Sequence, residues 1–409
     1  MHKIAVDEFK KYYSSLSPDK LEILDLVHRE IAFLQFGENV MIRHTAFDNV
    51  KGLKGRLSVD PPAHLYYSSA YYTAPAEPVM SDKGWTGADL IFDIDADHIP
   101  TACKDEHDTW VCLECGNAGR GFPPEGCTKC GKKRIDTRTW VCEKCLGVAK
   151  NEIFKLIDDY LEPDFGITKD EIEICFSGHR GYHLHIVNSE IKKLSNDGRR
   201  EIADYVRGIG LDQQLHGFRV IGKNERIEIG PNLKDRGWRG RLAQAIYDYL
   251  NKCDSDQLSK IMGRTMEKWG CRDKDDVLKK IAELSWWGGI KGSALEKLNL
   301  IAKESIKDIV CNIDERVTID TKRLIRYPNS LHGKSGLITK RLSYTELEGF
   351  DPLSKAVAFR GDSIKIYVKD APRIRIGDTS IGPLKDARVE VPKALGIYMI
   401  CRGAAEPLN

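Results

Sequence analysis

The chain has 409 residues, of which 41% are hydrophobic and 30% charged, and its 63 Lys and Arg nearly balance its 61 Asp and Glu for a formal net charge of +2. This composition is typical of a soluble globular protein with two or three domains, since one domain usually takes about 100 to 200 residues. The near-zero net charge excludes a protein that coats nucleic acid by charge alone. The sequence shows no long apolar run and no basic segment followed by an apolar one, so we expect neither membrane insertion nor secretion.

The first predicted element is a helix that begins near residue 17. Ser17 followed by Pro18 is typical of a helix cap and its first turn. Apolar residues then recur three or four positions apart, at Leu21, Leu24, Val27, Ile31 and Leu34. We therefore expect the helix to continue through this segment.

A buried strand is predicted over residues 89–95, which read Asp-Leu-Ile-Phe-Asp-Ile-Asp. Because side chains alternate along a strand, Asp93 and Asp95 share one face, and Asp97 follows if the strand continues. Carboxylates so close repel each other unless a cation lies between them, and oxygen ligands suit Mg²⁺ or Mn²⁺, which polymerases and nucleases use in pairs. Asp-x-Asp is also common by chance, so the pattern alone is equally compatible with a functionless strand edge.

Cysteines are concentrated in one segment: seven of the 12 lie between residues 103 and 145. Six of these form C-x-x-C pairs, at Cys112/Cys115, Cys127/Cys130 and Cys142/Cys145, and the seventh, Cys103, has His107 four residues later. This spacing is typical of structural zinc sites in a reducing compartment rather than of disulfides. Four pairs of ligands predict two zinc ions in closed sites.

The spacing leaves the ligand pairing open. Cys112/Cys115 and Cys127/Cys130 would form a short zinc ribbon, leaving Cys103/His107 for Cys142/Cys145; alternatively, Cys103/His107 pairs with Cys112/Cys115. The pattern Thr-Trp-Val-Cys-x-x-Cys occurs at residues 109–115 and again at 139–145. This repeat indicates a small metal module that was duplicated or interrupted by an insertion.

Residues 172–187 predict a strand, a tight turn and a second strand, with Ser177-Gly178-His179-Arg180-Gly181 at the turn. Ser177, Arg180 and His183 offer hydroxyl, guanidinium and imidazole donors that suit a triphosphate. Two other interpretations remain. His185 alternates with apolar residues and is expected to be partly buried, and the histidines at 179, 183 and 185 could form a transition-metal site, although no fourth ligand is adjacent.

The C-terminal half begins with helical periodicity from Leu242 to about Val310, which predicts a helical lobe. A charged segment follows, with Asp314 and Asp320, and then a basic loop that includes His332. After Arg360, alternation at residues 364–368 and 374–376 predicts strands, and a closing strand pair is expected near residues 389–400.

Together these motifs resemble the small, catalytic subunit of archaeal and eukaryotic replicative DNA primase, and the archaeal type most closely. The resemblance covers nearly the whole chain. It is carried by the segments His28-Arg29-Glu30, Ile42-Arg43, Phe92-Asp93-Ile94-Asp95, residues 177–183, Asp314 with Arg323-Leu324-Ile325-Arg326, and Ser330-Leu331-His332-Gly333-Lys334.

The resemblance implies an α/β catalytic core of archaeo-eukaryotic primase type with a zinc-binding module and a helical subdomain. We expect the core in residues 1–101, 146–240 and 311–409, the zinc module with its inserted ribbon in residues 102–145, and the helical subdomain in residues 241–310. The family's zinc knuckle matches Cys103, His107, Cys142 and Cys145. The ribbon formed by Cys112, Cys115, Cys127 and Cys130 departs from the family pattern and resembles an insertion.

The implied activity is template-directed synthesis of short RNA primers, and possibly DNA primers, on single-stranded DNA by two-metal nucleotidyl transfer. The implied catalytic ligands of Mg²⁺ or Mn²⁺ are Asp93, Asp95 and Asp314, and the implied nucleotide-binding residues are Ser177, Arg180, His183, His332, Arg326, Lys334, Glu30 and Arg43. NTPs and possibly dNTPs are the expected substrates, and a large subunit with an iron–sulfur cluster is the expected partner. The expected location is the cytoplasm of an archaeal cell, or the nucleus if the source is eukaryotic.

The third catalytic acid is either Asp314 or Asp320 by local pattern, since both follow an isoleucine. Matching Ser330 and His332 to the family's Ser-x-His motif favours Asp314, which we expect on an extended chain that continues through Val317. Two competing functions remain: a repair-type primase-polymerase, and a non-catalytic zinc-ribbon protein that binds nucleic acid.

Overall fold

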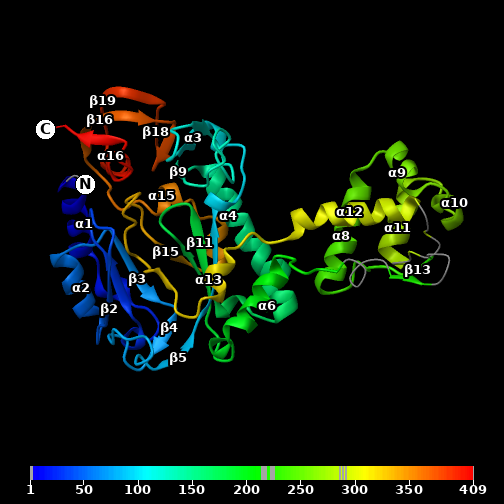
Figure 1. Ribbon diagram of the computed structural model, residues 1–409, viewed down its shortest axis with the longest axis horizontal. Coiled ribbons are helices and arrows are strands. Elements are labelled where there is room, and N and C mark those ends of the chain that lie inside the picture. The colour runs from blue at the N-terminus through cyan, green and yellow to red at the C-terminus, as the bar shows by residue number, and fades with distance from the viewer. Residues whose placement is uncertain are drawn as a thin grey trace. The chain divides into compact units, whose positions relative to one another are not determined.

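A computed structural model of the chain describes residues 3–212, 219–221, 226–284, 287, 290 and 293–408, with backbone alone at 219–221 and 226–229. The chain forms two compact units (Figure 1). The first unit comprises Met1–Phe154, Lys169–Arg200 and Asn312–Asn409, and the second comprises Lys155–Thr168 and Glu201–Cys311. Within the described ranges no helix is both long and apolar enough to span a membrane.

The first unit contains two four-stranded antiparallel sheets. One has the strand order β14 (Leu324–Arg326), β3 (His64–Ser68), β1 (Ile31–Leu34) and β2 (Met41–Thr45). Two helices that pack on each other, α1 (Lys3–Ser15) and α2 (Val50–Val59), accompany it (Figure 1). The other sheet has the order β15 (Lys340–Leu342), β10 (Ile172–Phe176), β11 (Gly181–Ile186) and β6 (Leu90–Asp95).

The second sheet confirms the predicted strand over residues 89–95 and the predicted strand, turn and strand over 172–187. β6 buries Leu90, Phe92 and Ile94 completely, while Asp93 and Asp95 are half-buried. β11 pairs with β6 so that His183 lies opposite Asp93 and Gly181 opposite Asp95. The turn at residues 177–180 therefore lies at the same end of the sheet as the carboxylates of Asp93 and Asp95.

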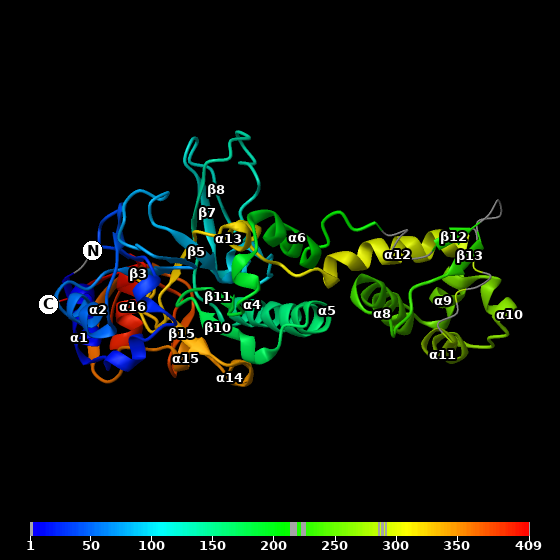
Figure 2. The ribbon, with the colours of Figure 1, turned by 90° about the horizontal axis from the view of Figure 1, so that it is seen from below.

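The cysteine-rich segment forms a small three-stranded sheet next to these elements. Its strands have the order β8 (Ala118–Arg120), β7 (Thr109–Cys112) and β9 (Ile135–Arg138), between the helices α3 (Lys104–His107) and α4 (Glu143–Lys155). In Figure 2 the β7–β8 hairpin extends away from the two larger sheets. The two copies of the sequence repeat differ in structure, because the first forms β7 and the second leads into α4.

The first unit also contains small sheets and short helices, most of them in its C-terminal part. Its other strands and α-helices are β4 (Ala70–Tyr72), β5 (Trp85–Ala88), α13 (Glu315–Ile319), α14 (Tyr344–Glu348), α15 (Pro352–Lys355), β16 (Ser363–Ala371), β17 (Ile374–Ile376), β18 (Thr379–Ile381), β19 (Leu384–Pro392), α16 (Lys393–Cys401) and β20 (Ala405–Pro407). β16 lies between β19 and β20, and β17 pairs with β18. The predicted alternation at 364–368 and 374–376 is confirmed as β16 and β17.

Two predicted elements are wrong. The expected helix after Ser17 is limited to two short 3₁₀ turns, Pro18–Leu21 and Leu26–His28, because Ile31 enters strand β1 and pairs with Tyr67. The expected closing strand pair contains β19, but its second half is the helix α16, whose residues 395–401 are all buried. A continuous apolar run carries no period, so its sequence cannot distinguish a strand from a buried helix.

The second unit is mainly helical, as the periodicity predicts. Its elements are a π-helical segment Leu156–Leu161, α5 (Glu162–Phe165), most of α6 (Asn196–Val206), β12 (Arg219–Ile221), β13 (Arg226–Ile229), α8 (Gly237–Lys252), α9 (Ser255–Met262), α10 (Thr265–Trp269), α11 (Lys274–Leu284) and α12 (Ser293–Ile309). Leu242, Ile246, Trp269 and Leu298 belong to its buried core. This unit extends beyond the expected helical subdomain: residues 155–168 and 201–240, expected in the catalytic core, lie in the second unit.

Candidate active site and metal clusters

Three carboxylates lie at the end of β6. Asp93 and Asp95 stand on the strand itself, and the backbone N–H of Asp314 donates to the carbonyl of Asp93 at 2.9 Å. The expected extended chain through Val317 is wrong, because Asp314 caps the N-terminus of helix α13 and its side chain accepts from the Arg316 N–H. Asp320 lies at the opposite end of that helix. The fold thus brings Asp314, and not Asp320, to β6.

The electrostatics of these acids favour a bound cation. Burial and the charge of Asp314 raise the pKa of Asp93 to about 6. Burial also raises the pKa of Asp95, and the charge of Asp93 adds to this effect. Carboxylates that share a partly buried place are stabilised by a divalent ion, and their hard oxygen donors fit Mg²⁺ or Mn²⁺.

The described part of the chain contains two groups of His and Cys whose ligand atoms all lie within 4.8 Å of one another. One is the knuckle cluster, made of Cys103, His107, Cys142 and Cys145, and the other is the ribbon cluster, made of Cys112, Cys115, Cys127 and Cys130. The structure thus decides between the two ligand pairings that the spacing leaves open. The carboxylates at β6 are not among these groups.

The geometry of both clusters fits a tetrahedral metal ion. The sulfurs of Cys103 and Cys145 lie 3.4 Å apart, and those of Cys112 and Cys130 lie 3.6 Å apart. Sulfurs bound to a tetrahedral zinc ion would lie about 3.8 Å apart, from a Zn–S bond of about 2.3 Å. In the knuckle cluster the Nδ1 of His107 lies 2.7 Å from Asp108, which leaves its Nε2 directed to Cys145. A carboxylate behind a ligating histidine is a common way to orient the ring.

The turn after β10 lies in a cluster of buried imidazoles. Gly178 has a φ of +79°, and a Cβ there would lie 2.8 Å from the Cβ of His332. His332 stacks on His179, with ring centroids 4.9 Å apart, and meets the edge of His64 at 4.8 Å. Burial lowers the pKa of His332 and of His179, so both rings are neutral at neutral pH.

Two positively charged side chains, Arg326 and Lys334, lie near these imidazole rings. Arg326 on β14 donates to the Nδ1 of His64, and burial, with the charges of Arg326 and Lys334, lowers the pKa of His64 to about 2. His64 was not predicted from the sequence, since it stands alone at the start of β3 and belongs to no recognisable motif. Its position beside Arg326 follows from the pairing of β3 with β14. The structure therefore brings His332, Arg326 and Lys334 close together and adds His64.

Other expected nucleotide-binding residues are engaged within the protein. His183 lies with its Nε2 3.5 Å from the Asp93 carboxylate, and burial lowers its pKa to about 3. The hydroxyl of Ser177 accepts from the backbone of His179 and Gly181 and thereby fixes its own turn. His185 stacks on Tyr67 and is almost completely buried, whereas the sequence predicts partial burial.

Arg180 differs most from its expected role. Its guanidinium is completely buried and pairs with Asp108 at 2.8 Å and Asp97 at 3.1 Å. It also donates to the sulfur of Cys145 at 3.4 Å. These contacts direct Arg180 to the knuckle cluster, whereas the sequence predicts that it binds a triphosphate.

Glu30 and Arg43 form a separate ionic group. Glu30 is completely buried and accepts from Arg43 at 2.9 Å, while the Lys83 ammonium, also buried, lies 3.2 Å away. Burial would raise the pKa of Glu30, but hydrogen bonds from Arg43 and from the His44 backbone hold it below its usual value. Glu30 is thus a structural anion, and the guanidinium of Arg43 is the partly exposed member of this pair.

Comparison with known proteins agrees with these motifs. The family described as DNA primase small subunit matches residues 134–344. The DNA primase small subunit PriS of Methanococcoides burtonii is 32% identical over 98% of this chain and 96% of its own length. The PriS proteins of Methanosarcina barkeri and Archaeoglobus fulgidus are 34% and 32% identical, each over 97% of this chain and over 94% and 96% of their own lengths. The chain therefore belongs to the archaeal-type family of DNA primase small subunits.

Proposed function

We propose that the active site of this DNA primase is the carboxylate group at the end of β6, and that it makes short primers on single-stranded DNA. The observation that carries the proposal is the 2.9 Å backbone bond that places Asp314 beside Asp93, because it joins two distant segments into one acidic site. The imidazole of His183 lies 3.5 Å from Asp93, and Arg323 and Arg326 are close enough to act on its charge, so donors for a triphosphate surround these carboxylates.

The chemistry follows from the placement of charge. Two divalent ions held by Asp93, Asp95 and Asp314 would activate the attacking 3′-hydroxyl and stabilise the charge on the phosphoryl group and on the leaving pyrophosphate. The new bond joins the 3′-oxygen to the α-phosphorus, and the bond between the α-phosphorus and the bridging oxygen breaks. Asp93 and Asp95 would hold the ions from one face of β6, and Asp314, which caps α13, would supply the third carboxylate.

The triphosphate site would consist of neutral imidazoles and two cations. His332 and His64 offer N–H donors, and Arg326 and Lys334 supply positive charge. The Nδ1 of His64 accepts from the Gly333 N–H and the Nδ1 of His332 accepts from the Lys334 N–H, so the Nε2–H of each neutral ring is the group that can donate to a phosphate. Ser177 and His183 support this site from the turn and from β11.

Replacing His332 with Ala should raise the apparent KM for nucleotide roughly tenfold to hundredfold, because a hydrogen bond to a charged phosphate contributes about 1.5 to 3 kcal/mol. Steady-state kinetics at saturating Mn²⁺ would measure this. His185→Phe is the matched control, since His185 is equally buried but stacks on Tyr67. A KM that changes equally in both variants would contradict the assignment of His332.

Both cysteine clusters are proposed to hold structural zinc, so elemental analysis of the purified chain should give two zinc ions. Cys142→Ser should lower the free energy of unfolding by about 3 kcal/mol or more, because its cluster is largely buried and contacts Arg180. Cys127→Ser should have a smaller effect, because Cys115 and Cys130 of the ribbon cluster are exposed. Calorimetric unfolding would compare them, and one zinc ion or the reverse order would contradict this account.

We further propose a primase large subunit as partner and NTPs as substrates, on the strength of family membership, and leave the use of dNTPs to experiment. Primer synthesis on single-stranded DNA, with each nucleotide type and with or without the large subunit, tests the function. Template-dependent product that requires Mg²⁺ or Mn²⁺ is expected. Binding to DNA without any synthesis would instead favour a non-catalytic nucleic-acid-binding protein.

A further inference from the structure

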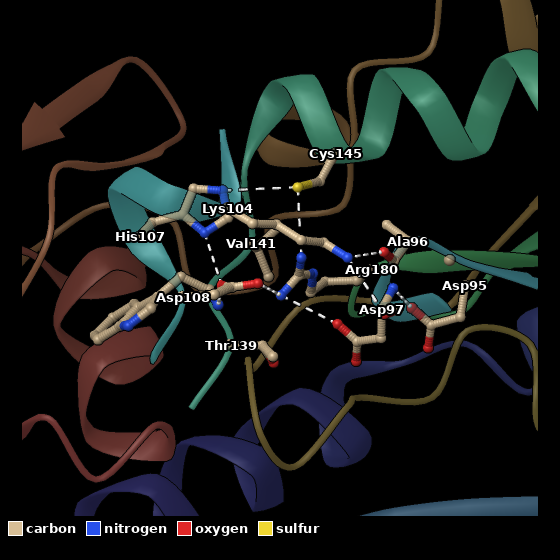
Figure 3. A network of polar contacts seen from close by, with 12 residues as sticks. Asp95, Ala96, Asp97, Lys104, His107, Asp108, Thr139, Val141, Cys145 and Arg180 are labelled. Carbon is tan, nitrogen blue, oxygen red and sulfur yellow. Dashed lines mark hydrogen bonds and ion pairs between the residues drawn. The ribbon is translucent and has the colours of Figure 1, made fainter. Parts of the chain in front are cut away.

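A continuous series of polar contacts joins the knuckle cluster to the carboxylates of β6 (Figure 3). The Nδ1 of His107 lies 2.7 Å from one oxygen of Asp108, whose other oxygen accepts from Arg180 at 2.8 Å. Arg180 pairs with Asp97 at 3.1 Å, and the Asp97 N–H donates to Asp95 at 2.9 Å. The series therefore runs from a metal-ligating ring to a catalytic carboxylate.

The contact between Arg180 and Asp108 is shielded from water. The side chains of Asp108 and Arg180 are 5% and 0% exposed, while that of Asp97 is 33% exposed. Charges in such a place interact more strongly than charges on the surface, and an uncompensated one is costly. Arg180 is accordingly balanced by its two carboxylates and by the sulfur of Cys145.

Helix α3, which carries His107 of the knuckle cluster, also contacts the segment that follows β6. The ammonium of Lys104, on α3, donates to the carbonyl of Ala96 at 2.6 Å (Figure 3). It also donates to the carbonyl of Ile99 at 2.8 Å. Asp108 in turn accepts from the backbone N–H of Trp140, which precedes Cys142. The segment that follows Asp95 is thus held by the same residues that frame the knuckle cluster.

The charges of Asp108 and Arg180 should affect how tightly the carboxylates of β6 bind a cation. Without the charge of Asp108, the guanidinium of Arg180 would be balanced chiefly by Asp97, and its positive potential at Asp95 would compete with a divalent cation. Without Arg180, the potential at Asp95 would become more negative. The two partners of this ion pair therefore have opposite effects on cation binding at β6.

We propose that Asp108 is a positioning residue that acts through Arg180: it holds the guanidinium toward the knuckle cluster and thereby keeps the carboxylates at the end of β6 available to the catalytic cation. The inference rests on the proposed role of Asp93 and Asp95 as metal ligands. In this inference, Arg180 connects the proposed structural metal site to the proposed catalytic one.

The test is a titration of the zinc-loaded, full-length chain with Mn²⁺, followed by electron paramagnetic resonance and without nucleotide. Asp108→Asn should bind Mn²⁺ about tenfold more weakly than the unmodified chain, while Arg180→Gln should bind it as tightly or more tightly. The double variant D108N/R180Q should lie within about threefold of Arg180→Gln, because Asp108 acts through the guanidinium. Zinc content should remain unchanged in all three.

Kinetics separates positioning from a merely structural role. Primer synthesis by Asp108→Asn should need about tenfold more Mn²⁺ for half-maximal rate, but should regain its kcat and its nucleotide KM when Mn²⁺ is saturating. Asp105→Asn, an exposed acid on the same helix α3, is the matched control and should behave as the unmodified chain.

Three results would overturn the inference: an unchanged Mn²⁺ affinity in Asp108→Asn, equal weakening by both single variants, or a double variant that binds about tenfold more weakly than Arg180→Gln. The last comparison decides the matter even if Asp108→Asn alone fails to fold, since the double variant leaves no unpaired guanidinium. Asp93→Asn distinguishes a failure of this inference from a failure of the proposed metal site. If the unmodified chain shows no Asp93-dependent Mn²⁺ binding, the proposed metal site itself fails.

Discussion

Asp93→Asn and Asp95→Asn should each reduce nucleotide addition by about a thousandfold or more. Each change removes a negative charge from the metal ligands while keeping the shape of the side chain, and loss of about 4 kcal/mol of transition-state stabilisation gives this factor. Primer extension with a fixed template and saturating Mn²⁺ would measure the rate. Asp48→Asn, a change at an exposed acid, is the control.

The same variants should keep or increase the stability of the metal-free fold. Because the pKa of Asp93 is raised to about 6 in the folded chain, above the usual value of about 3.9, its ionisation destabilises the fold as pH rises through this range. At pH 7 the Asn variant therefore avoids a penalty of about 2 to 3 kcal/mol. Thermal unfolding at pH 7 and pH 4 would detect it: the variant should gain at pH 7 only. Loss of activity together with loss of the fold would contradict the metal assignment.

Asp314→Ala should eliminate primer synthesis, with a decrease of about a thousandfold, while Asp320→Ala should keep substantial activity. The reason is positional, since Asp314 is hydrogen bonded through its backbone to Asp93 and Asp320 lies at the far end of α13. Mn²⁺ titration should show weaker binding in the first variant and unchanged binding in the second. An inactive Asp320→Ala with an active Asp314→Ala would show that the wrong acid completes the site.

The sequence predicted the parts of the site that depend on local pattern. Alternation along β6 and the paired glycines around the turn at residues 177–180 were sufficient for the strand, the turn and the face that Asp93 and Asp95 share. C-x-x-C spacing was likewise sufficient to propose two metal clusters, although not their pairing. The choice between the two pairings required the fold, because the two copies of the repeat, one in β7 and one leading into α4, lie in different clusters.

What the sequence could not supply are contacts between distant segments. Arg180 has the residue type of a phosphate ligand, yet its partners Asp97 and Asp108 precede it by more than 70 residues and neutralise it. His64 carries no motif and reaches the site only through strand pairing. The helix expected after Ser17 failed for the same reason: pairing of Ile31 with Tyr67 outweighs the local apolar spacing.

The most direct test of the account is anomalous diffraction from crystals of the chain grown with Mn²⁺ and a non-hydrolysable nucleoside triphosphate. The account predicts manganese peaks between the carboxylates of Asp93, Asp95 and Asp314, with the triphosphate against His332 and Arg326. Manganese bound elsewhere, with these three carboxylates free of metal, would contradict it.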